Sequence, residues 1–289
     1  MDSIKNVKNI NDIMNTARDF KRCNTRETIL QNSIFGLLFF EPSTRTCLSF
    51  ESAIHRLGGK IIKYNSEYSS EKKGESLEDT IKTLNYYVDV FIIRHPEKNI
   101  ISKIKKKTNK PIINAGDGDG EHPTQALLDL FTIYEQYPNL PENIVFTGDI
   151  KHSRTIHSLV YLLNSIKKDI CFYFVSEDEL QPDKELVKNL NYKIVSDISS
   201  IINVVDVLYV TRLQKERFKE NNLSVKNIII NDKLISKSKE NLIIMHPLPR
   251  NEELSCDLDE NSKSKYFEQV ENGVYVRMAI LFNLIKNIK

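Results

Sequence analysis

The sequence "IFGLLFFEPSTRT", residues 34–46, indicates how the chain folds. An apolar run is followed by Glu-Pro and then by two hydroxyl residues, an arginine and a third hydroxyl residue. Residues 34–40 have the length and apolar character of a buried strand. From Thr44 to Leu57 the apolar positions follow helical spacing, and Gly58-Gly59 is typical of a helix end. A buried strand that leads directly into a helix predicts a βαβ unit in a parallel sheet.

The same alternation of strand and helix continues along the chain. We predict further strands at 60–64, 89–93, 111–114, 144–149, 169–175, 205–210 and 242–246, and helices from Ser76, over Thr124–Tyr137 and Ser153–Asn164, from about Asp183, and over Asn272–Ile288. The fold class is therefore α/β, with two domains, each a parallel sheet flanked by helices, joined by interdomain helices. A break near 135–142, with two prolines, separates domain 1–135 from domain 136–271, and the closing helix 272–289 is expected to pack back on the first domain.

Composition excludes several classes of function. The 289 residues are 40% hydrophobic and 28% charged, and a formal net charge of +2 gives no field that favours nucleic acid or an anionic membrane. The four cysteines lack CxxC spacing, which argues against a zinc site and a disulfide framework and fits a reducing cytoplasm. We expect no secretory signal in the first residues and no membrane helix, because the longest apolar runs fall far short of ~20 residues.

Ligands of open parallel sheets bind beyond the carboxyl ends of the strands, so the segments after each strand matter most. Ser43-Thr44-Arg45-Thr46 opens a helix, and free backbone N–H groups, hydroxyl donors and a guanidinium together suit an anion. The alternative is that Ser43 only caps the helix and Arg45 is solvated. The chain lacks GxxxxGK[ST], which excludes a nucleotide P-loop.

Two more polar side chains follow strands in the first half. Arg94 ends one strand, and His122 follows the loop "AGDGDGEHPTQ", which fits neither an EF-hand nor GxGxxG. We interpret the loop as a flexible approach to His122, which could polarise a carbonyl group, with Gln125 one short step along the same helical turn. The alternatives are a surface arginine and a histidine with an ordinary polar role.

In the second half, Arg154 starts a helix just past one strand, Arg212 and Gln214 follow another, and "HPLPR" (246–250) ends a third in a turn stiffened by prolines. Two arginines at one sheet edge suit a substrate with two carboxylates, because guanidinium binds carboxylate through paired hydrogen bonds. A pair of surface arginines is the alternative.

Together, "FFEPSTRT", "SSEKKGES", "IIRHP", "HPTQALLDL", "GDIKHSRTIHSL", "TRLQKERF" and "HPLPR" resemble the aspartate carbamoyltransferase family, in the family's order and over nearly the whole chain. The resemblance implies transfer of the carbamoyl group of carbamoyl phosphate to the α-amine of L-aspartate, an early step of pyrimidine biosynthesis. It implies a homotrimer whose active sites are shared between subunits, and no metal or organic cofactor. Domain closure around both substrates is also expected.

The resemblance also assigns residues by position. Ser43, Thr44, Arg45 and Thr46 would hold the phosphate, Arg94 would bridge phosphate and carbonyl oxygen, and Thr46 and His122 would polarise the carbonyl. The carbamoyl NH2 would lie against Gln125 and the main-chain carbonyls of Pro247 and Leu248, and the aspartate carboxylates against Arg154, Arg212 and Gln214. Ser69 and Lys73 would reach in from the adjacent subunit.

One departure and several rival readings remain open at this point. Cys47 stands where the family often has a second arginine, and its spacing predicts a place on the buried face of the helix with Phe50 and Ile54. An ornithine carbamoyltransferase would usually read HCLP instead of HPLP and would bind a cationic amine. A catalytically silent homologue would act as a scaffold. A dinucleotide oxidoreductase lacks its main support without GxGxxG. The sequence does not identify regulatory chains.

Overall fold

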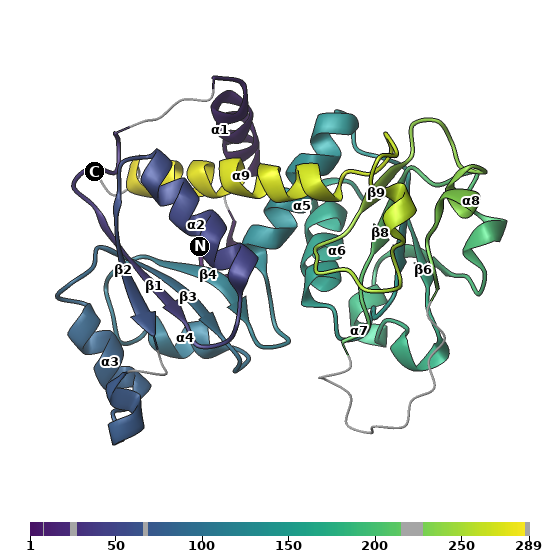
Figure 1. Cartoon of the computed structure of the whole chain (residues 1–289). Coiled ribbons are helices and arrows are strands. Elements are labelled where there is room, and N and C mark those ends of the chain that lie inside the picture. Colours follow the sequence, from purple (N-terminus) through teal and green to yellow (C-terminus); the bar gives the residue numbers. More distant parts are fainter. Residues whose placement is uncertain (8, 24–27, 66–68, 215–227, 287–289) are drawn as a thin grey trace. The chain divides into compact units, whose positions relative to one another are not determined.

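A computed structural model describes residues 1–7, 9–23, 28–65, 69–214 and 228–286 (Figure 1). The chain divides into two compact units. Unit 1 is Met1–Leu128 with Glu271–Lys289, and unit 2 is Asp129–Val270. Helices α5 (Pro123–Gln136) and α9 (Tyr266–Lys286) each contain residues of both units, so the covalent connections between the units are helical, as predicted.

Unit 1 contains a parallel four-stranded sheet in the order β2-β1-β3-β4. Its strands are β1 (Ile34–Phe39), β2 (Lys60–Asn65), β3 (Val90–His95) and β4 (Ile112–Asp117). All four strands were predicted from the sequence. Three of them, β1, β3 and β4, consist mostly of buried residues. Phe39 lies beside Arg94 and His95 beside Asp117, so the segments that follow β1, β3 and β4 start at one edge of the sheet.

Helices flank this sheet. They are α1 (Ile10–Cys23), α2 (Thr44–Arg56), α3 (Leu77–Leu84), α4 (Ile100–Ile104) and the first part of α5, with short 3-10 helices η1 (Ile4–Asn6) and η3 (Ser70–Lys73). The predicted start of α3 is confirmed, since the Ser76 hydroxyl accepts a hydrogen bond from the Asp79 N–H at 3.1 Å. Ile81 and Val88 are fully buried in the core beneath, whereas Leu77 and Leu84 are partly buried against it.

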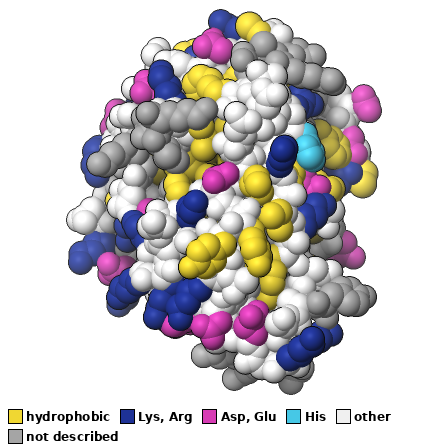
Figure 2. All heavy atoms as spheres, turned by 90° about the vertical axis from the view of Figure 1, so that its left-hand side faces the viewer, with side chains coloured by type: hydrophobic (Ala, Val, Ile, Leu, Met, Phe, Trp, Pro, Cys, Tyr) yellow, Lys and Arg dark blue, Asp and Glu magenta, His cyan; other side chains and the backbone are white. Residues whose placement is uncertain are grey.

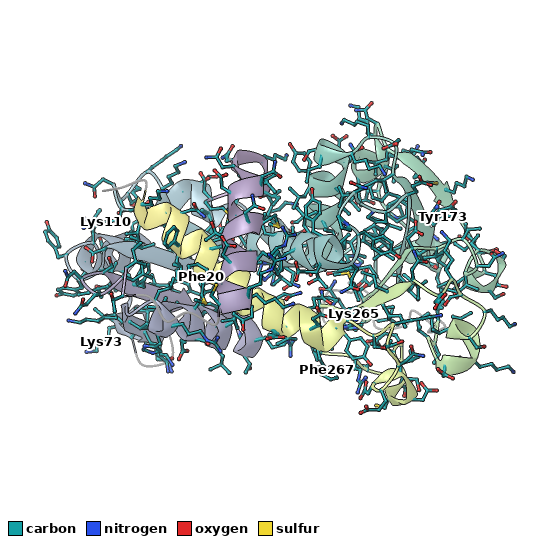
Figure 3. All side chains as sticks on the ribbon, turned by 90° about the horizontal axis from the view of Figure 1, so that it is seen from above. Phe20, Lys73, Lys110, Tyr173, Lys265 and Phe267 are labelled. Atoms are coloured by element: carbon teal, nitrogen blue, oxygen red, sulfur yellow. The ribbon has the colours of Figure 1, made fainter. Side chains whose placement is uncertain are left out.

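Helix α1 packs across α9 in unit 1 (Figures 1 and 3). The Phe20 and Phe282 rings meet edge to face with centroids 5.6 Å apart, and Lys21 Nζ donates to Asn272 Oδ1 at 2.9 Å. The sequence predicted this helix from Asn272, but it begins at Tyr266. Residues 287–289, which include its predicted end at Ile288, lie outside the described part of the chain.

Unit 2 contains a parallel five-stranded sheet in the order β7-β6-β5-β8-β9. Its elements are β5 (Asn143–Thr147), α6 (Arg154–Ile166), β6 (Cys171–Val175), η4 (Asp178–Leu180), α7 (Lys184–Val187), β7 (Asn191–Ile194), η5 (Ile198–Ser200), β8 (Val207–Val210), α8 (Asp232–Ile235), β9 (Ile243–Met245) and η7 (Cys256–Leu258). The sequence did not predict β7, because all its residues are exposed at the sheet edge and carry no burial pattern. The helix predicted from Asp183 is the single turn α7.

Candidate active site

The segment after β1 forms the amino end of α2. Ser43 is the N-cap residue, yet its hydroxyl accepts no capping hydrogen bond from the described first turn of the helix. Ser43 therefore holds the N-cap position without a capping hydrogen bond to its side chain. Thr46 is buried, Arg45 and Thr44 are exposed, and Ser43 is half-buried. A helix start with backbone donors, hydroxyls and a guanidinium is suited to a small oxyanion such as phosphate.

Arg94 and His122 meet at the ends of neighbouring strands. Arg94 Nη1 lies 3.5 Å from His122 Nε2, and Arg94 Nε donates to Glu41 Oε1 at 2.6 Å. His122 is buried, whereas the Arg94 side chain is 14% exposed. Sequence reasoning missed Glu41, although it lies in the quoted stretch. Its carboxylate neutralises Arg94 and competes for that guanidinium with any bound anion.

The loop between β4 and α5 is hydrogen-bonded to the side chain of Asp117. Asp117 Oδ1 accepts a hydrogen bond from the Glu121 N–H at 2.8 Å, and Asp117 Oδ2 accepts one from the Asn99 N–H at 3.1 Å. Gly118 has φ +52°, and a Cβ atom there would lie 2.5 Å from the Pro96 carbonyl oxygen. The loop backbone that leads to His122 is thus hydrogen-bonded to a buried carboxylate.

His122 begins α5 by accepting hydrogen bonds on its carbonyl oxygen from the N–H groups of Gln125 (3.0 Å) and Ala126 (3.1 Å). Gln125 is half-buried in the first turn of the same helix. The structure thus places His122, Gln125 and Arg94 at one edge of the unit 1 sheet, where α2 also begins.

Ser69 and Lys73 lie on a different element. Ser69 is half-buried just before η3, and Lys73 is exposed at the end of η3 (Figure 3). No hydrogen bond or ion pair of the described residues links Lys73 to the residues at the sheet edge.

Cys47 is half-buried on α2 and not fully buried as its spacing predicted. Its Sγ donates to Glu51 Oε1 at 3.2 Å, and Glu51 in turn pairs with Lys63 Nζ at 2.8 Å. Burial raises the pKa of the Cys47 thiol to about 11, and the hydrogen bond to the Glu51 carboxylate acts in the same direction. Cys47 is therefore a neutral hydrogen-bond donor that leaves the charge of the helix start to Arg45.

We expect Cys47 to resist alkylation at pH 8, where only about one thiol in a thousand is ionised at such a pKa. Peptide mapping after timed treatment with iodoacetamide should find Cys23 and Cys256, which are exposed, modified first. The variant Glu51→Gln removes the carboxylate and should speed Cys47 modification. Alkylation of Cys47 as fast as that of Cys256 in the native protein would contradict this picture.

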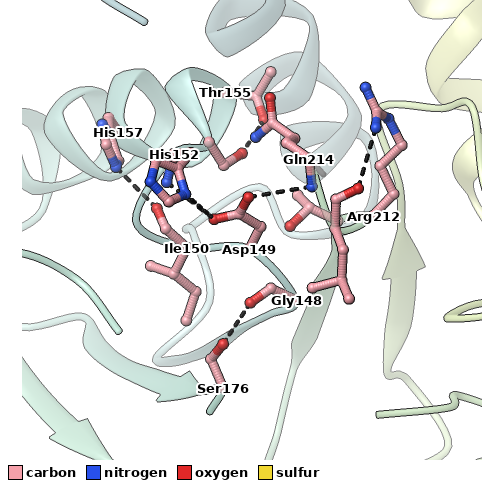
Figure 4. A network of polar contacts seen from close by, with 12 residues as sticks. Gly148, Asp149, Ile150, His152, Thr155, His157, Ser176, Arg212 and Gln214 are labelled. Atoms are coloured by element: carbon pink, nitrogen blue, oxygen red, sulfur yellow. Dashed lines mark hydrogen bonds and ion pairs between the residues drawn. The ribbon is translucent and has the colours of Figure 1, made fainter. Parts of the chain in front are cut away.

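In unit 2, the segment after β5 is organised around Asp149, which is fully buried (Figure 4). Asp149 Oδ1 accepts a hydrogen bond from the His152 N–H at 3.1 Å, and Asp149 Oδ2 accepts one from the Gln214 N–H at 3.2 Å. Gly148 has φ +100°, and a Cβ atom there would lie 1.9 Å from the Thr211 carbonyl oxygen. Only glycine permits this close approach of the two strand ends.

Asp149 therefore joins the two segments that carry the predicted carboxylate ligands. Arg154, the first residue of α6, is buried, and Arg212 and Gln214 are half-buried after β8. Arg212 Nη1 donates to the Leu213 carbonyl oxygen at 3.1 Å (Figure 4). Strands β5 and β8 are adjacent, so these residues follow neighbouring strand ends. Sequence reasoning missed Asp149, whose signal was an acidic residue directly after a strand and a glycine.

The segment after β9 is a turn in which Pro247 and Leu248 are half-buried. Within the described part of the chain, neither of their carbonyl oxygens accepts a hydrogen bond. Arg250 at the end of the turn donates from Nη2 to Asp259 Oδ2 at 2.6 Å, and this guanidinium lowers the pKa of Asp259 to about 2. The carbonyl oxygens of Pro247 and Leu248 are thus the acceptors that the turn offers. The ion pair between Arg250 and Asp259 holds the far end of the turn.

Among the residues that the structure describes, no group of three or more His, Cys, Asp or Glu side chains could hold a metal ion. No described helix has the length and apolar character that crossing a bilayer requires.

Two family models match the chain. Residues 3–135 match the aspartate/ornithine carbamoyltransferase carbamoyl-P binding domain, and residues 142–284 match the aspartate/ornithine carbamoyltransferase Asp/Orn binding domain. Together they span both units of the structure.

Curated relatives are similar over most of the chain. The aspartate carbamoyltransferase catalytic subunit of Methanobrevibacter smithii is 46% identical over 267 residues, which are 89% of this chain and 84% of that protein. The catalytic subunit of Thermoplasma volcanium is 43% identical over 272 residues, or 89% of this chain and 87% of that protein. The chain also matches Multifunctional protein pyr1-3 of Dictyostelium discoideum at 45% identity and Multifunctional protein CAD of Squalus acanthias at 41%, but spans only 12% of the length of each.

Solved structures show the same architecture. Aspartate transcarbamoylase from Trypanosoma cruzi in complex with carbamoyl phosphate and aspartate superposes with a TM-score of 0.92 at 37% identity, covering 97% of this chain and 94% of that one. The complex of the same enzyme with N-(phosphonacetyl)-L-aspartic acid gives a TM-score of 0.92 at 37% identity, with 98% and 94% covered.

Proposed function

Because the chain belongs to the aspartate/ornithine carbamoyltransferase family, we propose that it transfers the carbamoyl group of carbamoyl phosphate to the α-amine of L-aspartate. The products are N-carbamoyl-L-aspartate and phosphate, and the reaction is an early step of pyrimidine biosynthesis. The observation that carries the proposal is the Arg94–His122 pair beside the start of α2 in unit 1.

Carbamoyl phosphate binds at the sheet edge of unit 1 in this proposal. The phosphate is held by the backbone N–H groups at the start of α2 with Ser43, Thr44, Arg45 and Thr46, and Arg94 spans phosphate and carbonyl oxygen. Thr46 and His122 donate to the carbonyl oxygen, while Gln125 and the main-chain carbonyls of Pro247 and Leu248 accept from the NH2 group. The lack of a capping bond at Ser43 supports this reading, because its hydroxyl remains able to serve a ligand.

Aspartate binds through its two carboxylates to Arg154, Arg212 and Gln214 of unit 2. Asp149 supports these residues, since its carboxylate holds the backbone of Gln214 next to the segment that leads into α6. A dicarboxylate matches two guanidinium groups, whereas the extra amine of ornithine would meet like charge. The sequence HPLP (246–249) also favours aspartate.

The chemistry follows from these positions. The neutral aspartate amine attacks the carbonyl carbon, a C–N bond forms, and negative charge develops on the carbonyl oxygen. The C–O bond to phosphate then breaks, phosphate departs with the bonding electrons, and the departing phosphate accepts the proton that the nitrogen loses. Preorganised donors at the carbonyl oxygen and phosphate stabilise this charge, and holding both substrates in attack geometry lowers the entropic barrier.

The proposed reaction is tested by ³¹P NMR of the purified protein with carbamoyl phosphate. Conversion to inorganic phosphate should accelerate strongly when aspartate is added, and the variant His122→Ala should show little acceleration. Equal rates of phosphate release with and without aspartate would contradict the proposal and would favour a catalytically silent homologue.

We further propose that the chain assembles as a homotrimer in the cytoplasm, with Ser69 and Lys73 completing the site of the adjacent subunit. Lys73 is exposed on η3, as such a role requires. Unit 1 also exposes the large apolar side chains Leu48, Tyr86 and Tyr87. Figure 2 shows hydrophobic side chains grouped among charged ones on the face turned to the viewer. Grouped exposed apolar side chains are typical of an interface with another protein chain.

Subunit mixing tests the shared site. Lys73→Ala and His122→Ala chains should each be nearly inactive, but equal mixing under exchange conditions should restore about a quarter of the sites, in which both residues are intact. Mass spectrometry of differently labelled chains confirms that exchange occurred. Full exchange without recovered activity would show that Lys73 does not act across subunits.

A further inference from the structure

The turn that follows β9 is held by a buried histidine that the proposed reaction does not use. His246 is 1% exposed, and its Nδ1 accepts a hydrogen bond from the Leu248 N–H at 2.8 Å. Its other ring nitrogen, Nε2, lies 3.0 Å from Glu253 Oε1, and Glu253 is 3% exposed. A carboxylate beside Nε2 keeps the proton there, and so leaves Nδ1 as the acceptor.

The remaining contacts of this pair fix its position. Glu253 Oε1 also accepts from the Asn251 N–H at 2.8 Å, and the His246 N–H donates to Gln269 Oε1 at 3.0 Å. Gln269 Nε2 donates to Asp129 Oδ1 at 2.6 Å. All these groups belong to unit 2. These residues form a buried polar network in which each is hydrogen-bonded to another. Such a network holds its side chains in one arrangement.

The backbone that this network holds has an uncommon conformation. Leu248 has φ +53°, in the left-handed region that side chains other than glycine rarely adopt. Such a residue persists where its surroundings over-determine it, and the Leu248 N–H is the group that His246 fixes. The adjacent carbonyl oxygens of Pro247 and Leu248 accept no hydrogen bond from the described residues, so their direction is set through the N–H side of the turn.

We propose that His246, oriented by Glu253, is a positioning residue that aims the Pro247 and Leu248 carbonyl oxygens at the carbamoyl NH2 group. This inference rests on the proposed carbamoyl transfer. In this proposal His246 acts through the Leu248 N–H and not by contact with a substrate. Loss of the Nδ1 acceptor should therefore weaken use of carbamoyl phosphate while leaving the KM for aspartate almost unchanged.

Two substitutions separate positioning from a merely structural role. In His246→Asn the amide oxygen takes the place of Nδ1 and can still accept from the Leu248 N–H. In His246→Gln the amide takes the place of Nε2, which keeps the donor to Glu253 and loses the acceptor. Positioning predicts that His246→Gln loses about tenfold or more in kcat/KM for carbamoyl phosphate, whereas His246→Asn stays within about threefold of the native enzyme. A structural role predicts the reverse order, because Gln better fills the buried space and keeps the Glu253 hydrogen bond.

Thermal unfolding of both variants gives the order of stability beside the order of activity. In the native protein, ¹⁵N NMR reads the ring directly: we expect Nε2 protonated and Nδ1 unprotonated, with His246 assigned among the six histidines by the signal lost in His246→Asn. A proton on Nδ1, or equal kinetics of the two variants in an active enzyme, would overturn the inference. A native protein without carbamoyl transfer would instead refute the proposed function, while the NMR result would still stand.

Discussion

Replacing Arg45 by alanine lowers kcat for carbamoyl transfer by about 10²–10³-fold, because one preorganised donor to the developing phosphate charge is removed. Arg45 lies in the first turn of α2 and is exposed, so its side chain fills no space in the core. The unfolding temperature should stay close to that of the native protein. Initial rates at saturating aspartate, with a thermal unfolding curve for each variant, measure both quantities.

Two controls sharpen this result. Arg45→Lys keeps the charge but loses the planar fork that binds phosphate oxygens in pairs, so it should recover only part of the activity. Arg22→Ala removes an exposed arginine from α1 of the same unit and should leave kcat unchanged. Near-native turnover of Arg45→Ala would exclude Arg45 from the phosphate site.

Replacing Arg212 by methionine should raise the KM for aspartate by about 10–100-fold, since a charge-assisted hydrogen bond to a carboxylate contributes roughly 1.5–3 kcal/mol. Methionine keeps the length of the side-chain stem, so loss of packing is small. Arg212 belongs to unit 2, and the dissociation constant for carbamoyl phosphate alone should therefore change little. Steady-state kinetics over a wide range of aspartate concentration, with equilibrium binding of carbamoyl phosphate, make the comparison.

The matched control is Lys188→Met, which removes an exposed positive charge elsewhere in unit 2. If Lys188→Met raised the aspartate KM as much as Arg212→Met, the effect would be one of overall charge. If Arg212→Met left the aspartate KM unchanged, Arg212 would not be a carboxylate ligand.

Much of the fold could be predicted because strands such as β1 and β5 are buried along most of their length. Residues 34–40 and 144–146 form continuous apolar runs, and a helix start follows each strand, which is the pattern of a parallel sheet. Strand β7 carries no such signal, since it is exposed along its length at the edge of the sheet. Its pairing with β6 fixes it, and that is a tertiary contact that local sequence does not encode.

The site shows the same division between local and long-range information. Helix starts and strand ends can be predicted locally, which is why Arg45, Arg94 and His122 could be named from the sequence. The resemblance placed Arg94 and His122 at one carbonyl group, and the structure brings their side chains within 3.5 Å at the sheet edge. Glu41 and Asp149 were missed because a carboxylate has no periodic signature, and its importance depends on which backbone or guanidinium groups surround it.

His246 shows why the supporting residues are hardest to predict. The sequence identified the turn "HPLPR" by its prolines and by the family it resembles. It did not indicate that Leu248 is left-handed, or that the His246 ring is held between Leu248 and Glu253. These features follow from the register of β9 and from residues seven positions away.

A competition between acceptors tests most directly whether the protein carbamoylates aspartate. The purified protein is given carbamoyl phosphate with equal concentrations of aspartate and ornithine, and both products are quantified by mass spectrometry. We expect N-carbamoyl-L-aspartate as the product, and no more carbamoylated ornithine than forms without enzyme. Carbamoylated ornithine as the main product would contradict the assignment of Arg154 and Arg212 as carboxylate ligands and would make the protein an ornithine carbamoyltransferase.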